Sequence, residues 1–398
     1  MAKLNPGYDV HTLSGNIHRN LTHIMDSMFI DYSVKEKMFT FFEIEGCIPG
    51  TGEHALLEEI VNNNPWPKPI TVYGYDDSWG LLGDLFEAET TCVKERNMGQ
   101  VASTGVVNLG FFSREKEPVL KSNPDPEIAT YNSSKTYISF VVGDGDALYE
   151  YRNMKDEMTR RVGYCNDDPD GCFPLIWSIS PQMTKSAPLW IDWFYEQAQK
   201  TGKDFFILPP SGDLYSYPSL MSGQDRANFV NSTEVDAQKL DTSGTMAWEW
   251  VFSWEHAIKT YFPLYSLNNI VRGFFLVNVP YPLPIEAFFG TYKVVGGNTV
   301  LFKPLADWQR STDGNYTGHD KKDNLTPAQM SDKINHLKPG TVTYVYMTHD
   351  HGSSIESIYH CVQNLTEHVE VVNHNNLVDM ALSRENVLSF RNEIDIIQ

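Results

Sequence analysis

The stretch "FPLIWSISPQMTKSAPLWIDWFYEQAQKTGKDFFIL", residues 173–208, decides the fold. An apolar run over 173–180 precedes a segment, 186–203, in which apolar residues recur every three or four positions until Gly202. A second apolar run, 204–208, follows at once. This pattern predicts a strand, a helix and a second strand. Continuous apolar strands that alternate with helices are typical of a parallel sheet covered by helices on both faces.

The same alternation continues through the second half of the chain, with another helical segment over 353–368. Repeated strand–helix units of this kind favour a (β/α) barrel, regular or incomplete, over an open sheet. We therefore expect an α/β protein whose C-terminal domain, 134–398, is barrel-like. The apolar runs that predict its strands are 137–142, 173–180, 204–208, 271–277, 298–302, 342–347 and 368–372.

The first part of the chain, 1–125, predicts a smaller α/β domain. A polar, proline-containing segment over 114–135 follows it and is the best candidate for a domain boundary. The predicted elements of the smaller domain are a strand over 37–46, a helix over 53–63, a strand over 70–77 and a short β-element over 103–113.

The charge of the chain excludes two classes of partner. Its formal net charge is −20, from 51 acidic and 31 basic residues among 398. Such a charge repels nucleic-acid phosphates and anionic membrane surfaces, so we expect neither as a partner. Aromatic residues make up 13% of the chain, including 9 Trp and 20 Tyr. Flat uncharged ligands such as sugar rings are one reason to keep many aromatic side chains, and large aromatic cores are another.

The sequence gives evidence both for and against the secretory route. No apolar stretch approaches the roughly 18 residues that a membrane-spanning helix requires. The first 15 residues lack the apolar core of a signal peptide, which is evidence against this route. However, six N-x-S/T sequons occur where about three are expected by chance, which is evidence for it. We therefore expect a secreted or lumenal glycoprotein whose signal peptide is not in this chain. The sequons begin at Asn20, Asn132, Asn231, Asn315, Asn324 and Asn364.

The five cysteines give mixed evidence. Cys165 and Cys172 flank the polar turn "NDDPDG", so they are expected to close a short disulfide loop. Cys47 and Cys92 can pair only if the fold brings them together. Cys361 lies on an amphipathic stretch and would be left buried and free. The chain has no CxxC motif and no His/Cys cluster at zinc spacing, so we expect no metal and no cofactor.

Polar and aromatic residues follow the ends of several predicted strands. In a barrel all strand C-termini face one rim, so the loops of the second domain should converge on one cleft. The first domain contributes if it shares that cleft. The residues at these strand ends are Asp76, Asp77, Trp79, Asp144, Asp146, Ser178, Ser180, Asp213, Tyr215, Tyr217, His349, Asp350 and His351.

Most glycosidases use two carboxyl groups, one as a proton donor and one as a nucleophile or an activator of water. Asp144 and Asp146 flank a glycine, and a loop of this kind can hold both carboxylates near one point so that one stays protonated. We predict these two as catalytic residues. Glu249 and Glu286 are expected to be helix or surface residues instead. The candidates for the opposing carboxylate are Asp77, Glu87, Glu89 and Asp213.

Aromatic and polar side chains at the same strand ends would bind the substrate by stacking on sugar rings or by hydrogen bonds. These predicted substrate-binding residues are Asp76, Trp79, Trp177, Asp213, Tyr215, Tyr217, His349 and Asp350.

Seven motifs in this chain occur in the order found in one known family. They are "VYGYDDSW" (72–79), "GDLFEAET" (83–90), "NMGQVAS" (97–103), "NLGFFSR" (108–114), "FVVGDGDALYEYRN" (140–153), "FPLIWSISP" (173–181) and "PSGDLYSYP" (210–218). From about residue 31 to about residue 380 the chain resembles the GxGYxYP family, which is classed with the glycoside hydrolases. The resemblance implies a barrel-like C-terminal domain and sugar processing. It also implies that the family's N-terminal region begins before this chain does.

The chain departs from the family pattern at three places. Leu214 stands where the motif has its second glycine, and Ala147 stands where asparagine is more frequent. The loop "THDHG" (348–352) differs from the aromatic pattern at that position. These departures bear on catalysis more than on the scaffold, since a fold does not determine a function. A non-catalytic carbohydrate-binding protein on the same scaffold is therefore an alternative.

A metal-dependent deacetylase or hydrolase is the second alternative. The acids of the DGD loop and the histidines of the HDH loop, His349 and His351, offer oxygen and nitrogen ligands from two strand ends. A divalent cation with such ligands activates water for hydrolysis. The DGD loop alone could also bind a structural calcium ion.

Overall fold

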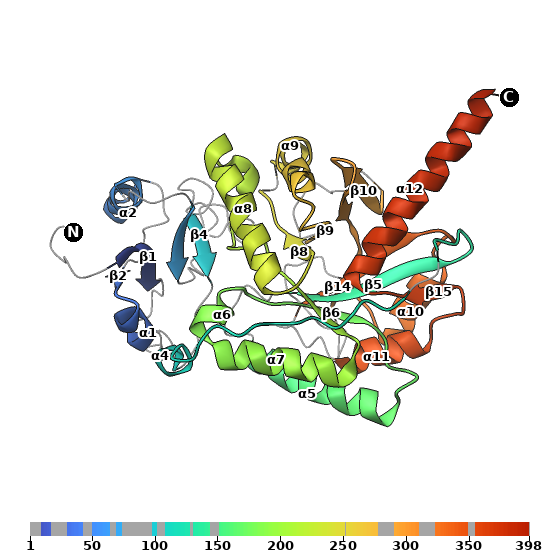
Figure 1. Cartoon of the computed structure of the whole chain (residues 1–398), viewed down its shortest axis with the longest axis horizontal. Coiled ribbons are helices and arrows are strands. Elements are labelled where there is room, and N and C mark those ends of the chain that lie inside the picture. The colour runs from blue at the N-terminus through green and yellow to red at the C-terminus, as the bar shows by residue number, and fades with distance from the viewer. Residues whose placement is uncertain are drawn as a thin grey trace.

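The computed structural model describes most of the chain and presents a small sheet beside a larger barrel (Figure 1). In the view of Figure 1 the small sheet lies at the left and the C-terminal helix leaves the barrel toward the upper right. The described residues are 9–16, 30–42, 50–63, 69–73, 98–101, 108–127, 130–143, 151–250, 252–277, 290–309, 323–348 and 355–397.

The small sheet is parallel, with strand order β2-β1-β3-β4. The predicted strands over 37–46 and 70–77 and the predicted helix over 53–63 correspond to β2, β3 and α2. The elements of this region are β1 (Asp9–Asn16), α1 (Ile30–Lys35), β2 (Met38–Phe42), α2 (Gly52–Asn62), β3 (Ile70–Tyr73) and β4 (Met98–Val101).

One prediction in this region is wrong. The segment 103–113 was expected to form a short β-element, whereas the described part of it contains helix α4 (Leu109–Phe112). The Asp31 side chain of α1 accepts a hydrogen bond from the backbone N–H of Gly110 at 2.8 Å. The Ser113 hydroxyl donates to the Leu109 carbonyl at 2.5 Å. The bond to the distant Asp31 and the bond from Ser113, at the C-terminal end of α4, therefore stabilise this helical turn. Local β-propensity did not predict it.

The larger domain contains a closed ring of parallel strands. Strand β14 pairs with β5, then β5 with β6, and β6 with β7. A parallel bridge between Leu208 and Thr245 joins β7 to β8, and β8 pairs with β9. The strands of the domain are β5 (Thr136–Gly143), β6 (Leu175–Ser178), β7 (Asp204–Ile207), β8 (Gly244–Ala247), β9 (Gly273–Leu276), β10 (Tyr292–Val295), β11 (Thr299–Phe302), β12 (Pro304–Gln309), β13 (Asp323–Asn324), β14 (Val342–Thr348) and β15 (Val369–Val371).

The segment 299–309 closes the ring. Only Lys303 separates β11 from β12, so the two are halves of one strand. The first half pairs in parallel with β9, and the second half pairs in parallel with β14. The sheet that starts at β14 therefore returns to β14, as the barrel prediction requires.

Helices cover the outside of the ring, and along the chain they alternate with its strands. Figure 1 shows α5 and α7 side by side along the lower edge and α8 and α9 along the upper edge. Gly202 ends α7 in the left-handed conformation, with φ of 64°, as the sequence predicted. The helices are α5 (Tyr151–Asp167), α6 (Met183–Ser186), α7 (Pro188–Thr201), α8 (Gly223–Lys239), α9 (Trp254–Thr260), α10 (Pro327–Asn335), α11 (Ile355–Gln363) and α12 (His374–Ile397), with short 3₁₀ helices η5 (Pro218–Leu220) and η6 (Phe262–Leu267).

The start of α12 closes the end of the barrel at which the strands begin. A Cβ atom on Gly244, the first residue of β8, would lie 3.0 Å from the His374 ring, and one on Gly273, the first residue of β9, would lie 2.9 Å from Val378. Arg272, just before β9, pairs with Asp379 at 2.5 Å. The carboxyl ends of the strands therefore form the other end of the barrel, where ligands bind in such folds.

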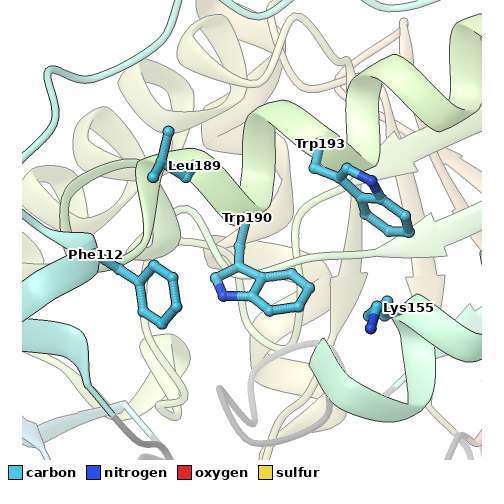
Figure 2. A pocket seen from close by; sticks show the side chains of 5 residues that line it. All are labelled: Phe112, Lys155, Leu189, Trp190 and Trp193. Atoms are coloured by element: carbon cyan, nitrogen blue, oxygen red, sulfur yellow. The ribbon is translucent and has the colours of Figure 1, made fainter.

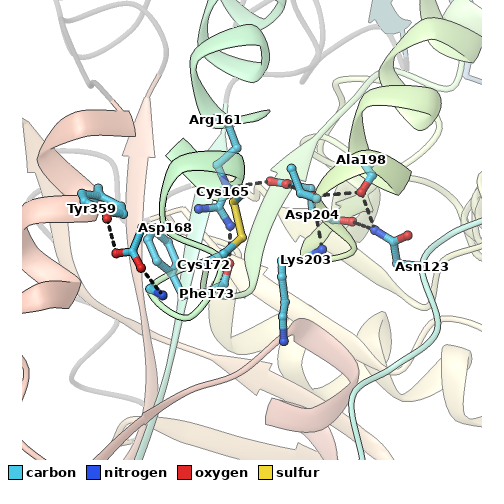
Figure 3. Close-up of a disulfide and its surroundings, with 12 residues drawn as sticks. Asn123, Arg161, Cys165, Asp168, Cys172, Phe173, Ala198, Lys203, Asp204 and Tyr359 are labelled. Atoms are coloured by element: carbon cyan, nitrogen blue, oxygen red, sulfur yellow. Dashed lines mark hydrogen bonds and ion pairs between the residues drawn. A yellow bond between two sulfur atoms is a disulfide. The ribbon is translucent and has the colours of Figure 1, made fainter. Parts of the chain in front are cut away.

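A buried charge pair connects the helix layer to the sheet (Figure 3). Arg161 of α5 and Asp204 of β7 are both buried, with the Arg161 Nε atom 3.3 Å from a carboxylate oxygen of Asp204. The same oxygen accepts the indole N–H of Trp177 at 2.8 Å, and Arg161 also donates to the Phe173 carbonyl. Thr201 donates to the second carboxylate oxygen. Strands β6 and β7 and helices α5 and α7 therefore meet at Asp204.

The expected disulfide between Cys165 and Cys172 is present, with the two Cα atoms 4.9 Å apart. It joins the end of α5 to the turn before β6, as Figure 3 shows. Cys361 is buried and free, as expected. Cys47 and Cys92 lie outside the described residues. None of the described helices is long and apolar enough to cross a bilayer.

We predict that Asp204→Asn lowers the free energy of unfolding by about 3–5 kcal/mol, because it leaves the buried Arg161 without its counter-charge. Urea denaturation of the purified variant measures this change. Glu255→Gln is the control, since it breaks an exposed pair with Lys259 on α9 and should leave stability almost unchanged. Equal losses in the two variants would contradict the role of Asp204.

Candidate functional site

Four neighbouring strands carry loops that the sequence singled out, and a fifth strand beside them, β8, carries a loop that it did not. Around the barrel these strands run β14, β5, β6, β7 and β8. The register pairs Thr348, the last residue of β14, with Gly143, the last residue of β5. The "HDH" and "DGD" loops therefore begin side by side. The loops after β6, β7 and β8 follow around the same arc of the rim.

Many of the predicted site residues lie outside the described part of the chain, so their geometry stays a prediction. These residues are Asp76, Asp77, Trp79, Glu87, Glu89, Asp144, Asp146, His349, Asp350 and His351.

Four aromatic rings from the loops after β7 and β8 form one group, which we call the rim aromatic cluster. It consists of Tyr215, Tyr217, Trp248 and Trp250. The ring centroids of Tyr215 and Trp248 are 5.7 Å apart, and those of Tyr217 and Trp250 are 5.9 Å apart. The hydroxyl oxygens of the two tyrosines are 3.2 Å apart. Tyr217 is buried, whereas the other three rings keep part of their surface exposed. The cluster is therefore anchored on one side and accessible on the other.

Glu249 fastens the two loops of the cluster together. Its carboxyl group is 1% exposed and accepts hydrogen bonds from the backbone N–H of Ser219 at 3.0 Å and from the Ser219 hydroxyl at 2.6 Å. The Ser253 hydroxyl donates to it at 3.3 Å. Burial raises the pKa of Glu249 to about 8, although the bonds from the serines oppose the shift. Glu249 therefore acts on the cluster by holding the chain just after Tyr217, at Ser219, and just after Trp250, at Ser253.

The sequence analysis did not assign Glu249 or its two tryptophan neighbours to the site. It expected Glu249 on a helix or at the surface, because the four-residue strand β8, "GTMA", was not predicted. This strand has a single β-branched residue, Thr245, so its propensity signal is weak. The signal that could have found the site is "WEW" at 248–250, an acid between two tryptophans at a strand end.

Asp213 lies on the loop after β7, on the side of the loop that faces α8. The side-chain amide of Gln182 donates to its carboxylate at 3.0 Å, and its backbone N–H donates to the Thr233 hydroxyl at 3.2 Å. Burial of the carboxyl group, and then the neighbouring carboxylate of Asp236, raise the pKa of Asp213 well above its usual range. Lys239 pairs with Asp236 at 2.8 Å and, together with Lys185, opposes this rise in the pKa of Asp213. Asp213 therefore keeps its proton to a higher pH than an exposed aspartic acid does.

The small domain touches the loop after β7. A Cβ atom on Gly99 of β4 would lie 2.4 Å from the Leu214 side chain, so only glycine allows this approach. Tyr73, at the end of β3, is buried, and Asp213 is among the charges that raise the pKa of its phenol. Residues of the two domains therefore meet beside the loop that carries Asp213 and Tyr215.

Trp177 lies away from this surface. It is 0% exposed, within the core between β6 and the outer helices, and its indole N–H is bonded to Asp204. The prediction that Trp177 binds substrate is therefore wrong, and we leave this residue out of the proposed site at the rim. Among the described residues no group of three or more His, Cys, Asp or Glu side chains could hold a metal ion.

We predict that Glu249 contributes a fall in stability as the pH rises from about 4.5 to about 8, because it keeps a proton in the folded state that the unfolded chain releases. Glu249→Gln removes this proton exchange, so the pH slope of its free energy of unfolding should be more positive than that of the wild type, by up to about 1.4 kcal/mol per pH unit. Denaturation between pH 5 and pH 9 measures the slope. Glu196→Gln, on the exposed face of α7, should retain the wild-type slope. A variant slope equal to that of the wild type would exclude Glu249 as its source.

Comparison with known families gives one match. Residues 134–382 match the model of the family described as "GxGYxYP putative glycoside hydrolase C-terminal domain". No curated protein matches the chain.

The solved structures that resemble this chain include one that matches almost its whole length. It is a "putative hydrolase" from Bacteroides thetaiotaomicron VPI-5482, with a TM-score of 0.70 and 19% identity. The match covers 95% of this chain and 67% of that protein, and at this identity it shows a shared fold. A "putative polysaccharide deacetylase" from Mycobacterium smegmatis is similar over 65% of this chain and 94% of its own, with a TM-score of 0.41 and 10% identity.

Proposed function

Because this chain belongs to the GxGYxYP family, whose C-terminal-domain model covers more than half of it, we propose that it is a carbohydrate-active hydrolase. The proposed site is the arc of the barrel rim formed by the loops after β14, β5, β6, β7 and β8. Its substrate is a glycan that lies along this arc.

The rim aromatic cluster is the observation that carries the proposal. Three of its rings are partly exposed at the carboxyl ends of β7 and β8, the end of a barrel at which ligands bind. Aromatic faces offer an apolar surface to the C–H face of a sugar ring, and the hydroxyl group of Tyr215 offers a hydrogen bond beside it, while the buried Tyr217 supports that hydroxyl from behind. Glu249 holds both loops in place through Ser219.

The carboxyl groups of the rim supply the chemistry in this proposal. Asp213 has the raised pKa that a proton donor to the leaving oxygen requires. Asp144 and Asp146 directly follow Gly143 at the end of β5, and we propose one of them as the nucleophile or as the base that activates water. Strand β6 separates β5 from β7, so these acids come from strands two positions apart. Asp77 and Glu87 of the small domain are the other candidates for the opposing carboxyl group.

We predict that Asp144→Asn or Asp146→Asn lowers the hydrolysis of a responsive glycan by a factor of about 10² or more, because the change removes a charge and a titratable proton while keeping the size. A screen of oligosaccharides with detection of reducing ends finds the substrate and then measures the rate. Asp156→Asn, on the exposed face of α5, is the matched control and should keep wild-type activity. Full activity in both loop variants would exclude this loop from catalysis.

Tyr215→Ala should weaken binding of the same glycan by about tenfold, because it removes one stacking face. Isothermal titration calorimetry of a catalytically inactive variant measures the affinity. Tyr131→Ala is the control, since Tyr131 is a partly buried tyrosine that precedes β5 at the opposite end of the barrel. If the wild type binds a glycan through Tyr215 but hydrolyses none, the chain is a carbohydrate-binding protein on this scaffold.

A metal-dependent hydrolase is the second candidate function. It is favoured by the register that pairs Thr348 with Gly143, since the "HDH" and "DGD" loops then begin at adjacent strand ends. Activity that is lost with a chelator and restored by Zn²⁺ would select this candidate and make His349 and His351 the ligands to test.

We also propose that the protein is secreted or lumenal. The Cys165–Cys172 disulfide supports an oxidising compartment. The sequon residues Asn132, Asn231 and Asn364 are exposed, as glycosylation would require. Mass spectrometry of the protein from its native source, before and after enzymatic deglycosylation, tests both features.

A further inference from the structure

A second aromatic surface lies on the outside of the barrel, away from the rim aromatic cluster. Phe112, Lys155, Leu189, Trp190 and Trp193 line a pocket of about 220 Å³, which we call the outer aromatic pocket (Figure 2). Phe112 comes from α4 and Lys155 from α5, and the other three come from the first turns of α7. The pocket is smaller than the about 300–1,000 Å³ of a site for a drug-sized ligand, so it suits a single ring.

The walls of the pocket are aromatic side chains that remain partly exposed to solvent. Ile191 and Phe194 of α7 face the core and are fully buried, whereas Trp190 and Trp193 remain partly exposed and Leu189 is 48% exposed. The rings of Trp190 and Trp193 are 6.2 Å apart at an interplanar angle of 75°, so they form two nearly perpendicular walls. The exposed ring surface in this hollow suits a flat apolar ring face of a ligand.

Lys155 gives the pocket its charge. Its ammonium group lies 5.9 Å from the centre of the Trp190 ring, and Figure 2 shows it on the side of the pocket shared by the two tryptophans. Within the part of the chain that the structure describes, this ammonium has no carboxylate partner. The net charge of −20 acts at long range and is screened beyond about 8 Å at physiological ionic strength. Lys155 is the one charged side chain among the five that line the pocket, so the lining favours an anionic group on the ligand.

We propose that the outer aromatic pocket binds an acidic sugar, a pyranose ring that bears a carboxylate. The C–H face of the ring stacks on an indole, and the carboxylate pairs with the Lys155 ammonium. The proposal rests on the proposed function, because it takes the ligand to be a glycan. It adds a binding site outside the barrel rim and a class of sugar for that site.

The position of the pocket fits a polysaccharide that continues beyond the active site. The loop that follows β6 leads through the short helix α6 into α7, and Gln182 on that loop contacts Asp213. The outer aromatic pocket therefore lies at the same end of the barrel as the rim. A chain bound at the rim could place a further residue there.

The test uses tetragalacturonate as the probe and its carboxyl-reduced, neutral counterpart as the comparison, with binding measured by calorimetry on the whole chain. We expect Lys155→Gln to weaken binding of the acidic probe at least tenfold and Lys155→Arg to retain most of it. Trp193→Ala should weaken it as well. Lys200→Gln, at the far end of α7, is the matched control and should bind like the wild type.

Three outcomes would overturn the proposal: no binding of tetragalacturonate, equal affinity for the neutral probe, or unchanged affinity in both Lys155→Gln and Trp193→Ala. The Tyr215→Ala variant separates this failure from failure of the proposed function. If Tyr215→Ala weakens glycan binding and the pocket variants do not, the rim site stands and the outer pocket falls. Loss of binding in the pocket variants alone supports the outer pocket and counts against the rim.

Discussion

Closure of the barrel by the segment 299–309 is the constraint on which the rest of the structure depends. One strand pairs with β9 through its first half and with β14 through its second half, so the sheet has no free edge between them. All pairs in the ring are parallel, which directs every strand C-terminus to the same end. The start of α12 covers the opposite end, near Gly244 and Gly273. One open end remains, and it holds the loops that carry the candidate chemistry.

The candidate site depends on buried polar groups that are satisfied within the protein. Asp204 joins two strands to two helices through Arg161, Trp177 and Thr201, and this fixes the start of β7. At the other end of the domain Glu249 holds the loops after β7 and β8 through Ser219. Both carboxyl groups are buried, but Asp204 forms an ion pair with Arg161, whereas burial raises the pKa of Glu249 despite the opposing charge of Arg226. Asp204 therefore stabilises the core as a charged group, whereas the hydrogen bonds of Glu249 to the two loops depend on pH.

Some aromatic residues of the chain fill the core, whereas others keep part of their ring surface exposed. Trp177 fills the core, although the sequence predicted that it would bind substrate. The rim aromatic cluster and the outer aromatic pocket keep ring surface exposed, one at the strand ends and one on the helix layer. Composition alone could not separate these uses, because it counts the tryptophans without showing which of them are buried. Burial separates them, and burial depends on which elements pack against each ring.

The sequence by itself determined the alternation of strands and helices, the end of α7 at Gly202, the Cys165–Cys172 disulfide and the motifs of the family. These features depend on local spacing: apolar periodicity, a residue with φ above zero, and two cysteines that flank a turn. The tertiary structure decided the helix at 109–112, the short strand β8 and the burial of Glu249. Each of these rests on contacts between distant segments, such as the bond between Ser219 and Glu249 or that between Gly110 and Asp31. No local pattern encodes such contacts, since a four-residue strand with one β-branched residue becomes a strand only when its neighbours in the barrel pair with it.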